Sequence, residues 1–242
     1  MMERQEYTKY LIEAFNKNGL HELIDEEKAE KLFDLYNILV EANKVMNLTA
    51  ITDEKEVILK HFIDSATVCT LIDGDLNVVD VGCGAGFPSL PLAILRPDLT
   101  VTAIDSTGKR VNFVNETVKK LSLSNVTAIC VRAEDFAKNY RESFDVCTSR
   151  AVARLNVLAE LCVPLVKVGG SFVPMKSERG EEELSEAQNC ISKLGCKLAR
   201  RKQLPLSLDT WLIQREIFVF NKTSRTPMQY PRNYSQITKK PL

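Results

Sequence analysis

The sequence predicts an α/β fold: a mostly parallel, seven-stranded sheet with an antiparallel edge, preceded by a helical N-terminal region. Apolar residues recur at helical spacing before residue 75, whereas short β-branched runs alternate with helical segments after it. Alternation of this length implies parallel pairing, with helices on both faces of the sheet. The first strand leads into a turn with Gly82, Gly84 and Gly86 at alternate positions, which lets the backbone approach a ligand closely.

The N-terminal region is expected to contain three helices. The first ends near Gly19, and the second is capped by Asp25 and has one apolar stripe. The third covers about residues 53–72. One side of this third helix carries three polar residues at helical spacing, which are His61, Asp64 and Ser65.

Seven runs rich in apolar and β-branched residues predict the strands, at residues 77–81, 101–105, 126–131, 144–148, 170–175, 197–204 and 212–220. No helix separates the last two runs, so we expect them to form an antiparallel pair at one edge of the sheet. Before them comes an acidic helix, in which Glu178 and Glu181 belong to a charge run that we interpret as a solvated face.

The composition describes an ordinary globular protein and signals no membrane role. The apolar runs are far shorter than the roughly 20 residues needed to cross a bilayer, and the N-terminus has no apolar signal core. We therefore expect a cytoplasmic protein, and we expect it to be a monomer. The seven cysteines are odd in number and lack CxxC spacing, which favours buried thiols over a disulfide framework or a metal site, so no metal is expected.

Charge is unevenly distributed although the net charge is zero. The helical region is acidic overall, whereas residues 221–242 carry five basic residues and no acidic one. This asymmetry points to a nucleic acid or another anionic ligand. We expect three units: residues 1–74, a helical region packed on the core; residues 75–220, an α/β ligand-binding domain; and residues 221–242, a basic tail.

The glycine-rich turn alone is a weak signal, because several nucleotide-binding folds share it. Asp80 precedes its first glycine, where it would repel a pyrophosphate but attract a cationic amino-acid group. Asp105 ends the second strand, where a carboxylate can accept hydrogen bonds from ribose hydroxyls. Residues 132–134 follow the third strand, where an adenine commonly lies. The ligand that these three features suit is S-adenosyl-L-methionine.

Five motifs occur in order along the chain: Asn47-Leu-Thr-Ala-Ile, His61-Phe-Ile-Asp-Ser, Asp80-Val-Gly-Cys-Gly-Ala-Gly-Phe-Pro, Asp105-Ser-Thr-Gly-Lys-Arg and Ser149-Arg-Ala-Val-Ala-Arg-Leu. Together they resemble the RsmG (GidB) family of bacterial methyltransferases, which act on N7 of one guanine in 16S ribosomal RNA. The resemblance implies a Rossmann-like class I methyltransferase fold. It also implies 16S ribosomal RNA or the 30S subunit as the partner.

The resemblance implies which residues form the cofactor site. Combined with the residues inferred from the turn, the expected cofactor-binding set is Asp80, Gly82, Gly84, Phe87, Asp105, Ser106, Thr107, Ala133, Glu134 and Arg150. Arg150 is also the expected catalytic residue, as a hydrogen-bond donor to guanine O6 or a phosphate. The alternative is that Arg150 only pairs with a carboxylate beside the cofactor. For His61 we favour a structural role over RNA contact.

The expected chemistry is a direct displacement, in which the enzyme brings the nucleophile and the methyl carbon into line. Guanine N7 carries a lone pair and no proton, so no general base is required. The fourth strand is followed by Thr148-Ser-Arg150 rather than by the Asn/Asp-Pro-Pro-aromatic turn of amino-group methylases. This difference agrees with a ring nitrogen as the acceptor.

Basic residues are expected to supply phosphate contacts to RNA, namely Lys109, Arg110, Lys176, Arg232, Lys239 and Lys240. Tyr230 and Tyr234 are candidates for stacking on unpaired bases. The tail departs from the family pattern at Asn233, Ser235 and Ile237, which leaves its path and its share of RNA contact open.

Three alternatives remain open from the sequence. One is a small-molecule methyltransferase on the same fold, and another is a non-enzymatic RNA-binding ribosome-assembly factor with a degenerate pocket. A dinucleotide-dependent oxidoreductase is the most distant, because Asp80 would disfavour a pyrophosphate.

Overall fold

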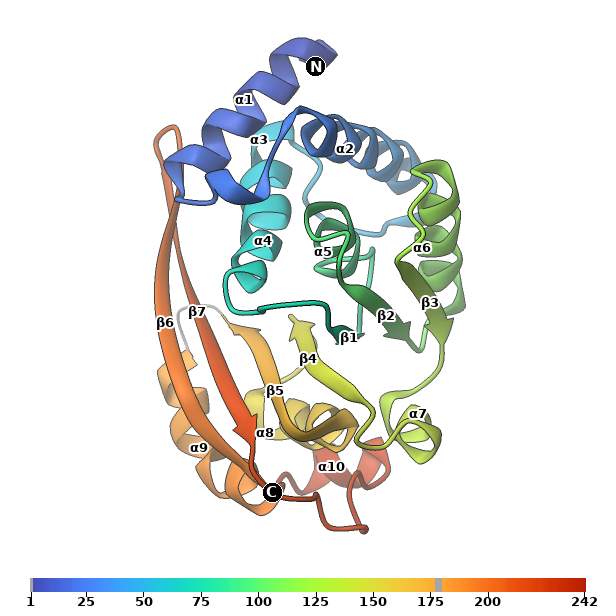
Figure 1. Cartoon of the computed structure of the whole chain (residues 1–242). Coiled ribbons are helices and arrows are strands. Elements are labelled where there is room, and N and C mark those ends of the chain that lie inside the picture. The colour runs from blue at the N-terminus through green and yellow to red at the C-terminus, as the bar shows by residue number, and fades with distance from the viewer. Residues whose placement is uncertain (1, 177–179) are drawn as a thin grey trace.

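The computed structural model describes residues 2–176 and 180–242, and it contains one sheet in the order β3-β2-β1-β4-β5-β7-β6 (Figure 1). The strands are β1 Asn77–Val81, β2 Thr100–Asp105, β3 Val126–Cys130, β4 Phe144–Arg150, β5 Val166–Lys176, β6 Cys196–Leu208 and β7 Trp211–Lys222. Strands β1 to β5 pair in parallel, whereas β7 is antiparallel to both β5 and β6. The predicted parallel sheet with an antiparallel edge is confirmed.

The N-terminal helices and the helices between strands lie where they are expected, whereas the short helix in the C-terminal tail was not predicted. They are α1 Arg4–Lys17, α2 Glu26–Met46, α3 Glu54–Val57, α4 Asp64–Cys69, α5 Ser89–Leu95, α6 Gly108–Lys120, α7 Ala133–Asn139, α8 Leu155–Cys162, α9 Gly180–Lys193 and α10 Tyr234–Lys239. Asp25 caps α2, since its Oδ1 accepts the Lys28 N–H at 2.9 Å. The predicted third helix is α3 and α4 joined by a π-helical turn, Ile58–Ile63. Glu178 of the predicted acidic run lies outside the described residues.

Helices cover both faces of the sheet because its side chains alternate with a period of two. Along β1, Val78 packs in the core formed with α1 to α6, whereas Val79 and Val81 pack in the core formed with α7 to α10. Figure 1 shows the first group of helices above the sheet and the second group below it. By this alternation Asp80 lies on the same face as Val78, toward α5.

The N-terminal helices are tied to the antiparallel edge of the sheet. The β6–β7 hairpin extends to the end of α1 (Figure 1), where the Asn18 side chain donates to the Ser207 carbonyl at 2.8 Å and accepts the Ser207 N–H at 2.9 Å. Side chains of the N-terminal helices share one hydrophobic core with β1 and β2. The predicted unit boundaries at residues 75 and 221 stay a prediction.

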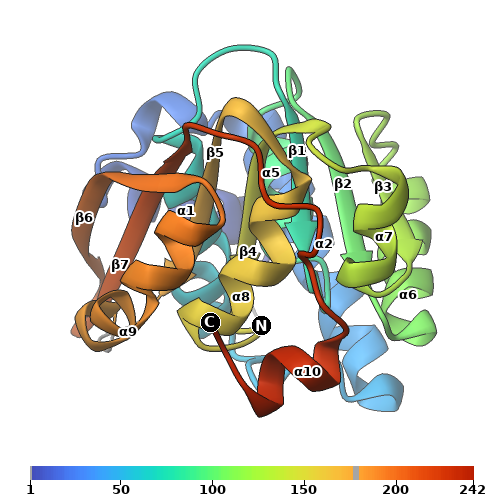
Figure 2. The same ribbon diagram turned by 90° about the horizontal axis from the view of Figure 1, so that it is seen from below.

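The C-terminal tail crosses α8 and ends in α10, beside α7 (Figure 2). Glu160 on α8 is fully buried, and its carboxylate accepts the Arg232 N–H at 2.9 Å and the Arg232 guanidinium at 2.8 and 2.5 Å. Arg141 donates to the carbonyls of Thr226 and Tyr230, each at 2.6 Å. Tyr230 is 4% exposed. Its predicted stacking on RNA is therefore wrong, because the ring is part of the core.

Six of the seven cysteines are buried free thiols and Cys130 is exposed, which confirms the predicted buried thiols at six positions. Within the described residues, no helix combines the length and the apolarity needed to cross a membrane.

Candidate functional site

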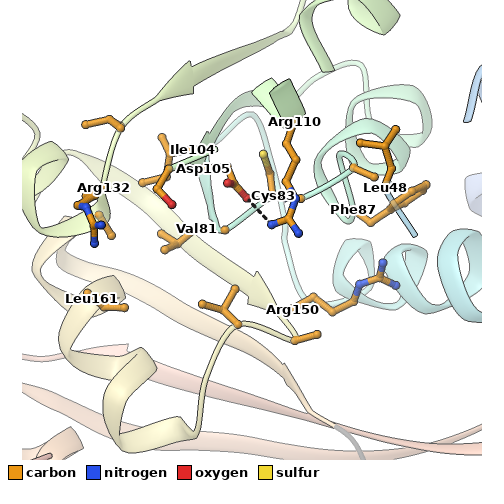
Figure 3. A pocket seen from close by; sticks show the side chains of 18 of the residues that line it. Leu48, Val81, Cys83, Phe87, Ile104, Asp105, Arg110, Arg132, Arg150 and Leu161 are labelled. Atoms are coloured by element: carbon orange, nitrogen blue, oxygen red, sulfur yellow. Dashed lines mark hydrogen bonds and ion pairs between the residues drawn. The ribbon is translucent and has the colours of Figure 1, made fainter. Parts of the chain in front are cut away.

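A cavity of about 600 Å³ opens at the carboxyl ends of the parallel strands (Figure 3). Val81 ends β1, Asp105 ends β2 and Arg150 ends β4, and all three line the cavity. Ligands in open α/β sheets bind at this edge, where loops after neighbouring strands converge. The cavity is therefore the candidate site.

The glycine-rich turn forms one wall of the cavity. The N–H groups of Gly82 and Cys83 donate to the Ile104 carbonyl at 2.8 and 3.0 Å, which holds the turn against β2. Gly82 has φ +77°, and a Cβ there would lie 2.4 Å from Cγ2 of Val152. Gly84 has φ +58° and no heavy atom within 4 Å of the position that a Cβ would take. These glycines let the backbone pass close to Val152 and leave it open to a ligand.

Asp105 is the acidic side chain that faces the cavity from β2. It is 6% exposed, and its two oxygens accept the Thr107 N–H at 2.8 Å and the Gly84 N–H at 3.1 Å. Arg110 lies 3.6 Å from the same carboxylate (Figure 3). Each carboxylate oxygen keeps a second lone pair, so the group can accept two more hydrogen bonds. Ser106 and Thr107, which follow Asp105 in the predicted cofactor-binding set, differ: Ser106 lines the cavity and Thr107 does not.

Asp80 lies beneath the turn rather than in the cavity wall. Its carboxylate is fully buried and accepts the hydroxyl of Ser89, the first residue of α5. Its other oxygen, Oδ1, has no hydrogen-bond partner among the described residues. Burial raises the pKa of Asp80 to about 6. A buried carboxylate oxygen without a partner is costly, so a donor that reached Oδ1 on ligand binding would stabilise it.

Arg150 joins the sheet to the N-terminal helical region. Its Nη1 donates to the Lys60 carbonyl at 2.7 Å and to Oδ2 of Asp64 at 3.1 Å, and its Nη2 lies 3.1 Å from Nδ1 of His61. Arg215 on β7 donates to the other Asp64 oxygen at 2.9 Å. Two guanidinium groups thus share one carboxylate, which leaves a net positive charge beside the cavity.

His61 is neutral, because burial, together with the positive charge of Arg150, lowers its pKa to about 3. Its Nδ1 lies 3.1 Å from both Nη2 of Arg150 and the Lys60 carbonyl, and its Nε2 lies 3.3 Å from Oγ1 of Thr49. With the proton on Nε2 the ring accepts from Arg150, and with the proton on Nδ1 it donates to Lys60. The ring stacks on Phe87 with centroids 4.4 Å apart. These contacts fit the structural role that we favoured for His61, although the ring also lines the cavity.

The far end of the cavity lies after β3. Val131, Ala133 and Glu134 line it, and Glu134 lies in the first turn of α7. Figure 3 shows Arg132 and Leu161 of α8 at this end. The tail reaches the same end, because Tyr234 lines the cavity and its N–H donates to Oε1 of Glu134 at 3.3 Å. The segment expected to border an adenine is thus in place, with an aromatic ring from the tail beside it.

Residues 28–207 match the family model GidB, described as rRNA small subunit methyltransferase G. The chain belongs to this family. The ribosomal RNA small subunit methyltransferase G of Staphylococcus aureus strain Newman is 45% identical over 237 residues, which cover 97% of this chain and 98% of that protein. The same protein of strain JH9 is 46% identical over an equal span. The resemblance inferred from five motifs is confirmed.

Solved structures share the fold at low sequence identity. M. jannaschii TYW2 in complex with AdoMet has a TM-score of 0.54 and 18% identity, over 66% of this chain and 74% of that one. TrmN from Thermus thermophilus has a TM-score of 0.51 and 18% identity, over 68% of this chain and 53% of that one. The Rossmann-like methyltransferase fold that the GidB resemblance implies is confirmed.

Two of the six predicted RNA-binding cations are held within the fold of this GidB chain. Lys176 is 9% exposed, and its ammonium donates to the Ala153 carbonyl at 2.6 Å and pairs with Glu183 at 2.8 Å. Arg232 is paired with buried Glu160. Their charges are compensated by carboxylates, so their contribution to RNA binding stays a prediction with less support than before.

The other four predicted cations lie nearer to solvent. Lys109 is exposed at the start of α6, next to Arg110, whose side chain is 43% exposed and lies at Asp105. Lys239 and Lys240 are exposed at the end of α10. The structure thus places Arg110 in the cavity lining, Lys109 next to it in the chain, and the other two cations on the tail.

Some residues of the site were not singled out from the sequence of this GidB member. Thr49 lines the cavity from within the first motif, Val152 packs against Gly82, and Arg215 pairs with Asp64. The signal for Arg215 is a charged residue, with Gln214 and Glu216 beside it, inside a strand that is otherwise mostly apolar. A partly buried arginine needs an acidic partner. Comparing Arg215 with the acidic residues of other elements could therefore have suggested Asp64.

Proposed function

We propose that this chain transfers the methyl group of S-adenosyl-L-methionine to N7 of a guanine in 16S ribosomal RNA. The observation that carries the proposal is the cavity at the carboxyl ends of β1, β2 and β4. It joins an open glycine turn, a carboxylate with free lone pairs and a cluster of arginines. Membership of the GidB family supports the same activity.

The cavity residues fit the cofactor from end to end. The backbone of Gly82 and Gly84 would lie along its amino-acid part, with Asp80 beneath supplying negative charge to the amino group. Asp105 would accept the ribose hydroxyls through its remaining lone pairs. Ala133 and Glu134 would border the adenine. When bound, S-adenosyl-L-methionine supplies an electrophilic methyl carbon on a sulfonium.

The residues of this chain orient the acceptor rather than activate it. Guanine N7 has its own lone pair, so no side chain needs to remove a proton, and neutral His61 is not required as a base. Arg150 can donate to guanine O6, which lies next to N7, while Asp64 and the Lys60 carbonyl hold its guanidinium. We place Arg150 as the catalytic residue and Asp64 as a positioning residue.

Exposed cations around the cavity suit a phosphate backbone. The side chains of Arg110 and Arg132 are 43% and 59% exposed, and both residues line the cavity. Lys109 adjoins them, and Lys239 and Lys240 extend the positive charge along the tail. Such a surface favours a polyanionic substrate over a small molecule. We propose that a monomer acts in the cytoplasm on 16S ribosomal RNA, either free or within the 30S subunit.

Lowering the pH from 7 to 5 is expected to weaken S-adenosyl-L-methionine binding about tenfold, through protonation of Asp80. The sign follows from a pKa of about 6, raised by burial, because the carboxylate is charged above that value and neutral below it. Because burial favours the neutral carboxyl, ionisation of Asp80 destabilises the cofactor-free fold. The stability that protonated Asp80 contributes is therefore lost as the pH rises through about 6. Calorimetric titration at both pH values measures the affinity.

The control for this pH effect is Asp80→Asn, which removes the titrating group and keeps the size of the side chain. Its affinity is expected to be low and nearly constant between pH 5 and pH 7. His61 stays neutral over this range and does not contribute. A wild-type affinity that is flat across this interval would contradict the role given to Asp80.

The proposed function is tested by incubating the protein with methyl-labelled cofactor and, separately, with 30S subunits, protein-free 16S RNA and no RNA. We expect label in the RNA, and the comparison of 30S subunits with protein-free 16S RNA shows which of the two is the substrate. We expect the yield to fall steeply with added salt because phosphate contacts are lost. Label incorporated equally with or without RNA would favour a small-molecule methyltransferase. Cofactor binding without any transfer to RNA would favour a ribosome-assembly factor.

A further inference from the structure

The end of the chain is fixed where it passes the candidate cofactor cavity. Arg232 forms a two-pronged ion pair with Glu160, which is fully buried in α8. Five residues later, Ile237 is 0% exposed and packs in the core formed with α7 to α10. Figure 2 shows this segment lying across α8 and next to α7. Both ends of the Arg232–Ile237 stretch are therefore anchored.

Tyr234 lies between these anchors and faces the cavity. It is 38% exposed, lines the cavity, and donates its backbone N–H to Glu134. Leu161 and Ala133 border the same end. The charged residues Arg132 and Glu134 line this end as well. A partly exposed aromatic ring there, held by its backbone, offers a π-face to a flat heterocycle.

We propose that Tyr234 is a cofactor-binding residue whose ring covers the adenine of S-adenosyl-L-methionine, so that the C-terminal tail completes the cofactor site. This inference rests on the cofactor placement given under the proposed function. It replaces the prediction that Tyr234 stacks on an RNA base. Base–aromatic stacking is favourable for any purine, and the ring reaches this position without further folding of the anchored tail.

The test measures dissociation constants of full-length variants for S-adenosyl-L-methionine and for adenosine alone. Tyr234→Ala is expected to weaken both ligands by a similar factor of about ten, because both carry the adenine. Tyr234→Phe, which keeps the ring, is expected to bind like wild type. Ser235→Ala, an exposed neighbour on the same helix, is the matched control and should change nothing. Thermal melting of each variant establishes that it is folded.

A second measurement does not depend on losing the ring. The chain has one tryptophan, Trp211, so Tyr234→Trp in a Trp211→Phe background carries a single fluorophore at the proposed contact. Its emission is expected to change on addition of adenosine and to saturate with the dissociation constant found by calorimetry. No change in emission, or a Tyr234→Ala affinity within twofold of wild type, would overturn the proposal.

These outcomes are separable from those of the proposed function. A protein that binds the cofactor through Tyr234 but methylates no RNA would contradict the function and leave the inference standing. A protein that methylates 30S subunits and binds the cofactor equally well with Tyr234→Ala would contradict only the inference.

Discussion

Asp105→Ala is expected to weaken S-adenosyl-L-methionine binding by about 10- to 100-fold, or roughly 1.4–2.8 kcal/mol. The substitution removes the acceptor proposed for the ribose hydroxyls. It also leaves the N–H groups of Gly84 and Thr107 without the carboxylate that they contact at 3.1 and 2.8 Å. The glycine turn should therefore loosen as well. Calorimetric titration with the cofactor measures the loss.

The control for Asp105 is a second carboxylate on the same side of the domain. Asp135 on α7 is an exposed acid whose side chain pairs with Lys138, so Asp135→Ala removes a charge without touching the cavity. It should bind the cofactor like wild type. If Asp105→Ala also bound like wild type, the ribose would have to be held elsewhere in the cavity.

Arg150→Ala is expected to reduce turnover on RNA by about 100-fold or more, with a much smaller loss in cofactor affinity. The guanidinium is proposed to orient the guanine, so its removal affects the transfer step more than the binding of the methyl donor. Its loss also leaves Asp64 with Arg215 as its remaining arginine partner and removes the donor to His61. Single-turnover assays and calorimetry separate the two effects.

A matched control for Arg150 lies in the same motif. Arg154 pairs with Glu182 and Glu186 on α9 and its side chain is 56% exposed, so Arg154→Ala removes an arginine that faces away from the cavity. It should retain turnover. Equal losses of turnover and cofactor affinity in Arg150→Ala would contradict the catalytic role. They would support the alternative that Arg150 only pairs with a carboxylate beside the cofactor.

Local patterns were enough to predict the sheet and the position of the site. The alternation of Val78, Val79 and Val81, the glycines at 82 and 84, and the absence of a helix between β6 and β7 each have a short-range physical cause. Asp105 follows from the same reasoning, because the end of a parallel strand determines where its last side chain lies.

The contacts that the sequence did not predict join residues far apart in the chain. Arg215 and Asp64 are 151 residues apart, and Arg232 and Glu160 are 72 residues apart. No local periodicity encodes such pairs. The position of Tyr234 depends on the Arg232–Glu160 pair, because that pair directs the tail toward the cavity. Asp80 is buried under α5 since the strand alternation turns it toward Ser89.

The chemical identity of the methylated nucleoside tests the proposed transfer to guanine N7 most directly. After reaction of the purified protein with 30S subunits, the 16S RNA is digested to nucleosides and analysed by mass spectrometry against standards. We expect 7-methylguanosine, formed by wild type and strongly reduced with Arg150→Ala. A methyl group on an exocyclic amino group or on a pyrimidine carbon would contradict it, because neither acceptor reacts without the proton removal or covalent activation for which this cavity has no assigned residue.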